Sequence, residues 1–203
     1  VFVGAGLGLR LYQDVARSPD VLGMRWTQAM QGLRWSSGVI SLLFVVAGLI
    51  WLPDVSWRVI FCIALSELFC MPVVTFVAFA YAGVGRMGQA AAAPVVMSVA
   101  RLGAVIIALL FVSQPVDIAH YAYLHAGAAV IAAIWLLAHC RKQLAPPPTV
   151  ASIAWADLKE GVRLSSIWAS GLALGSLDKP VALRFYGAEA TGNYSAAQRF
   201  VSL

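Results

Sequence analysis

Charged residues are scarce in this sequence of 203 residues. Asp, Glu, Lys and Arg make up 11% of it and hydrophobic residues 61%, whereas an average soluble domain has about 25% charged residues. A soluble fold cannot hide this much apolar surface, because its outer surface must face water. The mean hydropathy of +0.83 supports the same conclusion. The composition therefore excludes an ordinary soluble domain and predicts an all-α, polytopic transmembrane helical bundle.

Motifs of catalytic and metal sites are also lacking. The three cysteines form no CxxC pair and no zinc-type cluster with histidine, and the sequence has no Walker loop, nucleophile elbow or usefully spaced pair of carboxylates. Residues 4–8 resemble a dinucleotide loop without its third glycine, so we interpret them as small residues for close helix packing. His120 and His125 fall near an outer helix end, where an interfacial role is expected. We expect no enzymatic activity, no metal and no cofactor.

Dense basic blocks are absent, although the net charge is +5. A nucleic-acid-binding surface would cluster Lys and Arg with interleaved aromatic residues. Here most basic residues lie between apolar runs, where they orient transmembrane helices. We therefore expect no nucleic-acid partner.

Apolar runs long enough to cross a bilayer, about 20 residues each, recur along the chain. We expect five full spans and two partial ones, with Pro72 as a kink. The partial spans are at the two ends, so we expect the chain to be a fragment. The expected spans are residues 1–13, 33–52, 57–82, 94–113, 118–139, 161–183 and 192–203.

One clear linker separates these spans into two groups. It runs from Leu144 to Ala156 and has three prolines at its centre, which favour an extended tether. We expect a first transmembrane lobe over residues 1–140, a cytoplasmic Pro-rich inter-lobe linker over 141–156, and the start of a second lobe over 157–203.

Basic residues are distributed unequally between alternate connections, and cytoplasmic loops of membrane proteins are enriched in Lys and Arg. One set of connections, with Arg58, Lys179 and Arg184, is expected outside, and Trp51, Trp57, Tyr121 and Tyr123 fit an aromatic belt there. The other set is expected inside and holds Arg10, Arg17, Arg25, Arg34, Arg86, Arg101, Arg141, Lys142, Lys159 and Arg163.

Ionisable residues within expected spans are costly and often functional. Glu67 lies well inside its span, on a face with Ala64 and Met71, and a lone carboxylate at that depth needs a partner or a proton. Arg101 is expected nearer the cytoplasm, where it could also extend to the lipid headgroups. Asp178 and Lys179, near an outer end, could be a simple interfacial pair.

The end of the chain carries a motif that resembles a known family. Gly161-Val162-Arg163 opens a helix, Asp178-Lys179 lies near its outer end, and residues 192–199 read Gly-Asn-Tyr-Ser-Ala-Ala-Gln-Arg. These features, together with Arg86-Met87 and residues 100–102, resemble the polysaccharide (O-antigen and exopolysaccharide) flippases of the MATE-like multidrug/oligosaccharidyl-lipid/polysaccharide (MOP) exporter superfamily.

The resemblance implies a MOP/MATE-like bundle of about twelve to fourteen helices, of which this chain holds the end of helix two to the start of helix eight. It implies a flippase in the bacterial cytoplasmic (inner) membrane that moves an undecaprenyl pyrophosphate-linked oligosaccharide. Membrane lipids, a polysaccharide polymerase and glycosyltransferases are the implied partners. Arg101, Lys179, Arg184 and, more weakly, Arg34 would bind the headgroup, and Glu67 or Asp178 would carry a coupling proton.

Two other functions are open to a chain of this kind. Another exporter of the superfamily, such as a drug/cation antiporter or a lipid II flippase, would share the fold, but a drug antiporter would favour acidic cavity residues. A membrane-embedded polysaccharide polymerase or glycosyltransferase would require a long polar outer loop, and this sequence has none.

Overall fold

The computed structural model describes residues 4, 6–51, 55–111, 118–144, 153, 155–174, 185–187 and 189–195. No strand occurs within these ranges, so the predicted all-helical fold is confirmed. Residues 185–187 and 189–195 are helical as well. The principal elements are α1 (Leu7–Arg17), a 3-10 turn η1 (Pro19–Val21), α2 (Leu22–Trp51), α3 (Trp57–Ala64), a π-helical segment η2 (Leu65–Cys70), α4 (Met71–Gly83), α5 (Met87–Phe111), α6 (Ile118–Leu144) and α7 (Trp155–Leu174).

Among the described residues, four helical segments are long and apolar enough to cross a membrane. They are Pro19–Trp51, Trp57–Gly83, Met87–Leu110 and Ala119–Leu144. Many of their outward side chains are large and apolar, and Leu42, Ile50, Leu109 and Ile131 are each about two-thirds exposed. In water such a surface would be strongly unfavourable, whereas in lipid every backbone polar group is already satisfied within the helices. The molecule is therefore a polytopic helical membrane protein.

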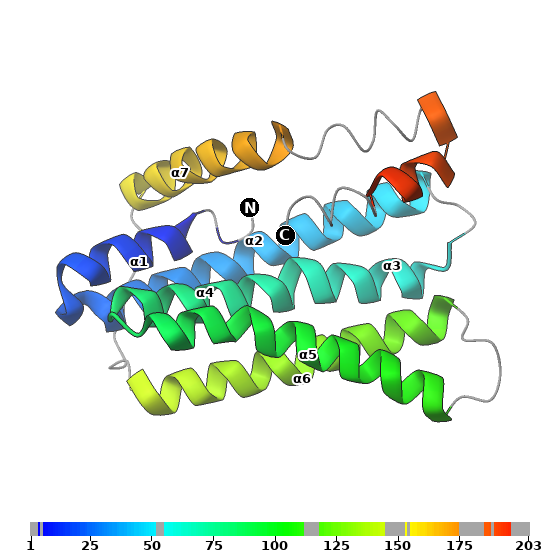
Figure 1. Ribbon diagram of the computed structural model, residues 1–203. Helices are drawn as coiled ribbons and strands as arrows, with labels where there is room; N and C mark the ends of the chain where they lie inside the picture. Colours follow the sequence, from blue (N-terminus) through cyan, green and yellow to red (C-terminus); the bar gives the residue numbers. More distant parts are fainter. Residues whose placement is uncertain are drawn as a thin grey trace.

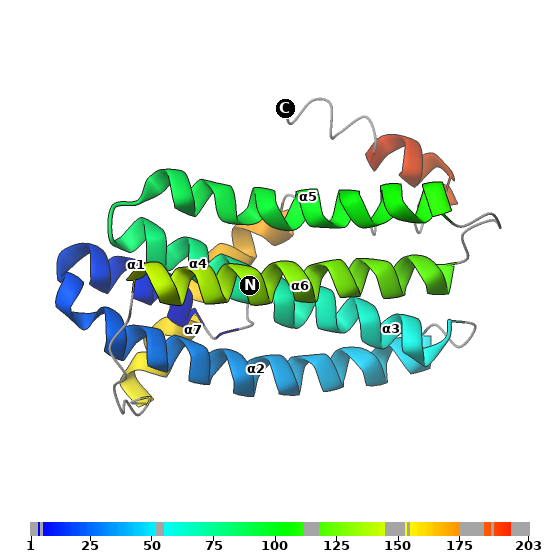
Figure 2. The same ribbon diagram turned by 90° about the horizontal axis from the view of Figure 1, so that it is seen from below.

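The segment α3–η2–α4 is one continuous span, and successive spans from α1 to α6 run in opposite directions, so alternate connections lie at the same end of the bundle (Figure 1). We call the end with the α1–α2 connection, the α4–α5 connection and the start of α7 the basic end. It carries Arg17, Arg25, Arg86, Arg141 and Lys142. The view from below shows α5 and α6 beside each other, and α2 along the edge of the bundle opposite α5 (Figure 2).

Two arginines that we expected at the basic end lie well inside the bundle's length instead. At about 1.5 Å per residue, Arg34 is about 18 Å into α2. Arg101 is about 20 Å into α5, which begins at Met87 rather than at residue 94. The helix continues through Pro94, where Ser98 Oγ donates to the Pro94 carbonyl oxygen at 3.1 Å. Arg101 is therefore not close to the basic end, because α5 begins at Met87, before Pro94.

The span that contains Glu67 changes its helical form midway. Leu65–Cys70 is π-helical, and Pro72 follows it in the first turn of α4. Proline has no N–H to donate and its ring crowds the carbonyl one turn earlier. A wide turn before Pro72 relieves that crowding. At the position where we expected a kink, Pro72 thus follows a π-helical segment within a continuous span.

Small residues allow the helices of the core to approach closely. Leu11 and Val15 of α1 and Val77 and Ala80 of α4 have almost no exposed surface. A side chain on Gly8 would collide with the Phe76 ring, and the prediction of close packing by the glycines of residues 4–8 is confirmed.

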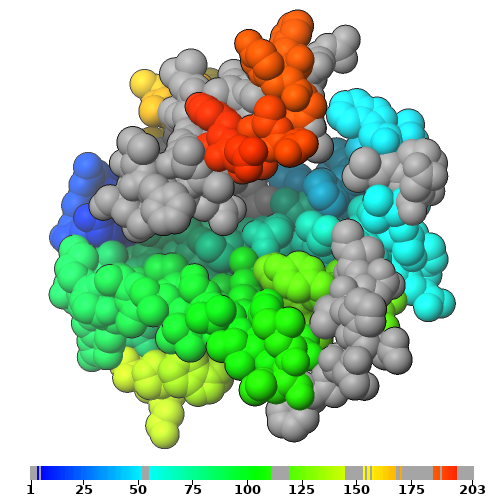
Figure 3. Space-filling view, turned by 45° about the vertical axis from the view of Figure 1, so that its right-hand side comes forward, coloured from blue at the N-terminus to red at the C-terminus, as the bar shows by residue number. Residues whose placement is uncertain are grey.

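The first helix of the expected second lobe, α7, packs on the α1 side of the bundle, while α5 and α6 lie on the opposite side (Figure 1). Figure 3 shows α5, in green, as a broad surface at the front of the molecule. The exposed residues of α5 include many large apolar ones, such as Val95, Val99, Leu102 and Ile106. The bundle therefore presents α5 as an exposed apolar side and uses α1 for contact with α7.

Candidate functional site

Ionisable side chains of the described residues gather at two places. The central cluster, within the span of the bundle, consists of Ser66, Glu67, Arg101 and His125. The end cluster, at the basic end, consists of Arg10, Asp14, Arg25, Gln28, Asp157 and Glu160.

Three helical elements supply the central cluster. Ser66 and Glu67 lie on η2, Arg101 on α5 and His125 on α6. With a rise of about 1.5 Å per residue, the ionisable side chains lie about 10 to 15 Å inside the helix ends opposite the basic end. The cluster is therefore in the interior of the span, where an isolated charge is costly.

A single carboxylate oxygen is the centre of this cluster. Glu67 Oε1 accepts from Arg101 Nη2 at 2.6 Å and is 3.2 Å from His125 Nε2. Ser66 Oγ donates to the same oxygen at 3.3 Å and accepts from Arg101 Nη2 at 2.7 Å. Arg101 therefore supplies the partner that a carboxylate at this depth requires.

The π-helical form of η2 bears directly on this geometry. A π-turn contains an extra residue compared with an α-turn, so it changes which side chains face a neighbouring helix, and such turns are frequent at functional sites. Here Ser66 and Cys70 are buried, while the neighbouring Glu67 extends toward α5 and α6. The wide turn thus allows two adjacent polar residues to contact Arg101.

Arg101 retains hydrogen-bonding capacity after these contacts. A guanidinium has five N–H donors, and both hydrogen bonds described for Arg101 use Nη2. Its Nε is buried and has no hydrogen-bond partner among the described residues. Because an unpaired buried donor is unfavourable, this arginine is suited to accept an anionic ligand.

A hollow of about 260 Å³ lies beside His125, between α5 and α6. Its lining is apolar apart from two aromatic side chains, and the rings of Tyr121 and His125 are 5.6 Å apart. His125 thus has Glu67 as one neighbour and an apolar hollow as another. The lining residues are Val105, Ala108, Leu109, Tyr121, Leu124 and His125.

Within the described ranges, no three His, Cys, Asp or Glu residues are placed to hold a metal ion. The central cluster offers one carboxylate and one imidazole beside a guanidinium, and the cation would repel a metal ion. Its composition suits anion binding and proton exchange.

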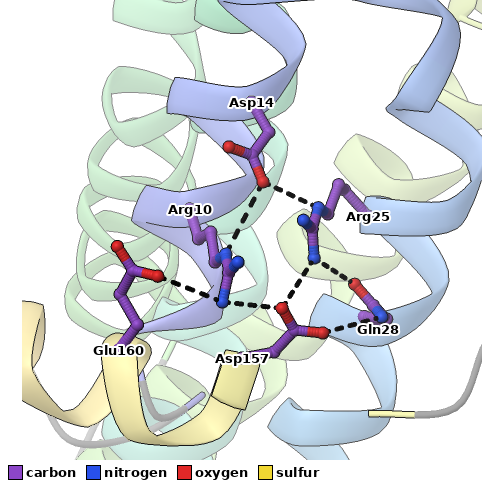
Figure 4. A network of polar contacts seen from close by, with 6 residues as sticks. All are labelled: Arg10, Asp14, Arg25, Gln28, Asp157 and Glu160. Carbon is purple, nitrogen blue, oxygen red and sulfur yellow. Dashed lines mark hydrogen bonds and ion pairs between the residues drawn. The ribbon is translucent and has the colours of Figure 1, made fainter. Parts of the chain in front are cut away.

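The end cluster joins α7 to α1 and α2 (Figure 4). Asp157 Oδ1 lies 2.7 Å from Arg10 Nη1 and 3.3 Å from Arg25 Nη1. Arg25 Nε also contacts Asp14 Oδ2 at 2.7 Å. Gln28 accepts from Arg25 Nη1 at 2.8 Å and donates to Asp157 Oδ2 at 3.3 Å. Arg10 and Arg25 therefore both contact Asp14 on α1 and Asp157 on α7.

Burial distinguishes the two carboxylates that α7 contributes. The Asp157 side chain is 13% exposed, whereas Glu160, which is 3.6 Å from Arg10 Nη1, is 61% exposed. Exposed ion pairs contribute little to stability, whereas removing one partner of a buried pair is costly. Asp157 is therefore the principal link between α7 and the first helices.

Backbone contact accompanies this link. Gly6 has a φ of +69°, and a Cβ there would collide with the carbonyl oxygen of Gly161 on α7. Ser165, one turn further along α7, is buried at the same contact. Only glycine combines this backbone conformation with so close an approach.

The predicted site residues have different outcomes. The structure brings Glu67 and Arg101 into direct contact, although we had assigned them separate roles. Arg34 is exposed on α2 and belongs to neither cluster. Asp178, Lys179 and Arg184 lie outside the described residues, and their predicted roles stay predictions.

His125 and the end cluster were missed in the sequence. We interpreted His125 as interfacial, but it contacts Glu67. A usable signal was the turn near Gln114, because Arg101 and His125 lie at similar distances on either side of it and antiparallel helices bring such positions together. Arg10 and Asp14, four residues apart, were a signal of a charged helix face.

Comparison with known families gives one finding. The model of the family described as "Polysaccharide biosynthesis protein" matches residues 1–203. Neither the curated proteins nor the solved structures give a significant match.

Proposed function

Because the chain belongs to the polysaccharide biosynthesis protein family, we propose that it is part of a flippase of the MOP/MATE-like type. Its substrate is an oligosaccharide linked to undecaprenyl pyrophosphate, which it moves across the bacterial cytoplasmic membrane. It performs no covalent chemistry itself. The polymerase and glycosyltransferases that act on the same lipid-linked saccharide are its expected partners.

The observation that supports this proposal most is the hydrogen-bonding state of Arg101. A pyrophosphate with attached sugars cannot cross hydrocarbon unaided, because its charges would lose their hydration. A protein path must therefore offer donors within the bilayer, and arginine suits phosphate oxygens by geometry and charge. Arg101 lies within the span and has a buried Nε without a partner among the described residues.

The distribution of charge supports an orientation. Arg86, Arg141 and Lys142 are at the basic end, while Arg58 is at the opposite end. Positive residues favour the cytoplasmic side, so the basic end is cytoplasmic in our proposal. The lipid-linked substrate then enters from that side.

The end cluster supports a mechanism in which two lobes rock about a cavity. Arg10 and Arg25 belong to the first lobe, and Asp157 to the start of the second. These contacts hold the lobes together at the basic end. Opening toward the cytoplasm requires that Asp157 separate from both arginines.

A drug/cation antiporter fits the central cluster less well. Such a site needs a carboxylate available to a cation, and Glu67 is already in contact with Arg101 at 2.6 Å. The nearby guanidinium would also repel a cationic substrate.

The leaflet in which the lipid-linked saccharide accumulates tests the proposal. In a host strain depleted of the intact protein, loss of a flippase leaves the saccharide in the cytoplasmic leaflet, where an oxidant added outside cannot reach it. Re-expression of the wild-type protein should restore its exposure outside. If depletion instead leaves the saccharide in the outer leaflet, the protein acts after translocation, as a polymerase would, and the proposal is wrong.

A further inference from the structure

His125 shares its carboxylate partner with Arg101. Its Nε2 is 3.2 Å from Glu67 Oε1, the same oxygen that accepts from Arg101 Nη2. An ionised carboxylate oxygen only accepts, so this contact requires a hydrogen on Nε2, in either the neutral Nε2 tautomer or the imidazolium. Arginine and histidine thus share one acceptor oxygen.

The ionisable groups around His125 come from three elements. Glu67 on η2 contacts it, Arg101 on α5 contacts the same oxygen, and Tyr121 lies one turn earlier on α6. Cys70 lies within electrostatic range of both Glu67 and Arg101. Of these groups, histidine is the one that ordinarily changes charge between pH 5 and 8.

The net charge of the cluster depends on that proton. With a neutral imidazole, the charges of Glu67 and Arg101 cancel. With an imidazolium, the cluster carries one positive charge within the length of the span, which is unfavourable without an anion nearby. An anion at Arg101 would balance this charge.

We propose that His125 is the proton-binding residue of the central cluster, and that its protonation and the binding of an anionic headgroup at Arg101 favour each other. The identity of the anion, a pyrophosphate, rests on the proposed function. The coupling is reciprocal because binding free energies are linked: whatever the anion does for the proton, the proton does for the anion.

The exchange of partners gives this coupling a structural basis. A protonated His125 forms an ion pair with Glu67 Oε1 and weakens the hold of that oxygen on Arg101 Nη2. Arg101 can then direct Nη2 and Nε to the anion. When His125 returns its proton to water, Arg101 pairs with Glu67 again and the anion is released. One proton is taken up with each anion and given back with it, and no covalent bond changes.

Pyrophosphate binding at two pH values tests the inference. The intact protein, purified in lipid nanodiscs, is titrated calorimetrically with inorganic pyrophosphate at pH 5.5 and pH 8.0. Pyrophosphate itself titrates in this range, so the decisive quantity is the difference between wild type and His125→Gln, which keeps a donor for Glu67 but gains no charge. The ratio of the affinity at pH 5.5 to that at pH 8.0 should be at least about fivefold larger in the wild type than in His125→Gln.

His120→Gln is the matched control, because His120 is an exposed histidine on the same helix. It should retain the pH dependence of the wild type. His125→Arg, which carries a permanent charge, should show a reduced pH dependence like that of His125→Gln, and it serves if the glutamine variant does not fold. Wild-type pH dependence in both His125 variants would overturn the inference.

The inference and the proposed function can fail separately. If the wild type binds no pyrophosphate at either pH while the leaflet assay succeeds, the inference is wrong and the flippase stands. If pyrophosphate binding depends on His125 while depletion leaves the saccharide outside, the coupled site stands and the flippase is wrong.

Discussion

Arg10 and Asp157 contact each other through Nη1 and Oδ1 at 2.7 Å, from helices on opposite sides of the Pro-rich linker. The pair is mostly shielded from solvent, with side-chain exposures of 17% and 13%. This ion pair thereby holds α1, before the linker, to α7, after it, at the basic end. The effect of breaking the pair can be measured against substitutions of nearby exposed residues.

Removing the charge of Asp157 should open the basic end. In Asp157→Asn, both arginines lose their shared partner, at a cost of about 1 to 3 kcal/mol. Ser165 is buried at the contact between α7 and α1, so in the purified protein Ser165→Cys should react with added maleimide several-fold faster in the Asp157→Asn background. Glu160→Gln is the control, since Glu160 is 61% exposed, and it should leave the rate nearly unchanged. Equal rates in both backgrounds would contradict a role for Asp157.

Adding a methyl group to Gly6 should loosen the same contact. Alanine at a positive φ costs about 1 kcal/mol through backbone strain, and at Gly6 its Cβ also collides with Gly161. Gly85→Ala is a matched control, because Gly85 has a φ of +78° with nothing near its would-be Cβ. Thermal unfolding of the intact protein in detergent should show a larger loss for Gly6→Ala. Equal losses would mean that strain alone matters.

Substitution of Arg101 should lower polysaccharide export without lowering the amount of protein. Arg101→Ala removes the charge-assisted donors proposed to contact the headgroup, worth about 1.5 to 3 kcal/mol or roughly a tenfold to hundredfold change in rate. Export is measured as surface polysaccharide, and protein by immunoblot. Arg58→Ala, at a helix end where Arg58 stacks over Trp57 at 5.7 Å, should have little effect. Normal export in Arg101→Ala would remove this residue from the site.

Glu67→Gln should also impair transport, because the amide keeps the size of the side chain but cannot balance the charge of Arg101 or form an ion pair with a protonated His125. The loss should not add to that of Arg101→Ala, since residues in one ion pair are coupled by about 0.5 to 3 kcal/mol in double-mutant cycles. Export rates of both single variants and the double variant measure this coupling. Full activity of Glu67→Gln would reduce Glu67 to a packing residue.

The sequence predicted the helices of the bundle better than their limits. Apolar runs identify the membrane-spanning parts, but α2 begins at Leu22, before its expected span. Its first turns contain Arg25 and Gln28, which no hydropathy pattern assigns to a helix. These polar side chains are stable there because Arg25 forms an ion pair with Asp14 and Gln28 donates a hydrogen bond to Asp157. Such contacts depend on the tertiary structure and cannot be predicted from the local sequence.

The candidate site was predicted in part for the same reason. Charges inside apolar spans drew attention to Glu67 and Arg101, but which residues pair depends on how helices face each other. The π-helical segment that places Ser66 beside Arg101 leaves almost no trace in the sequence apart from Pro72. The hydropathy of a near-uniform apolar run does not show where a π-turn interrupts an α-helix.

The π-helical segment also makes the central cluster sensitive to a change within one helix. A π-turn holds one residue more than an α-turn, and each residue of an α-helix corresponds to a rotation of about 100° about the axis. If the extra residue moved along the helix past Glu67, its carboxylate would rotate by about that angle, away from Arg101 and His125. A local rotation within this one helix would thus break the Glu67–Arg101 ion pair while the surrounding helices stay in place.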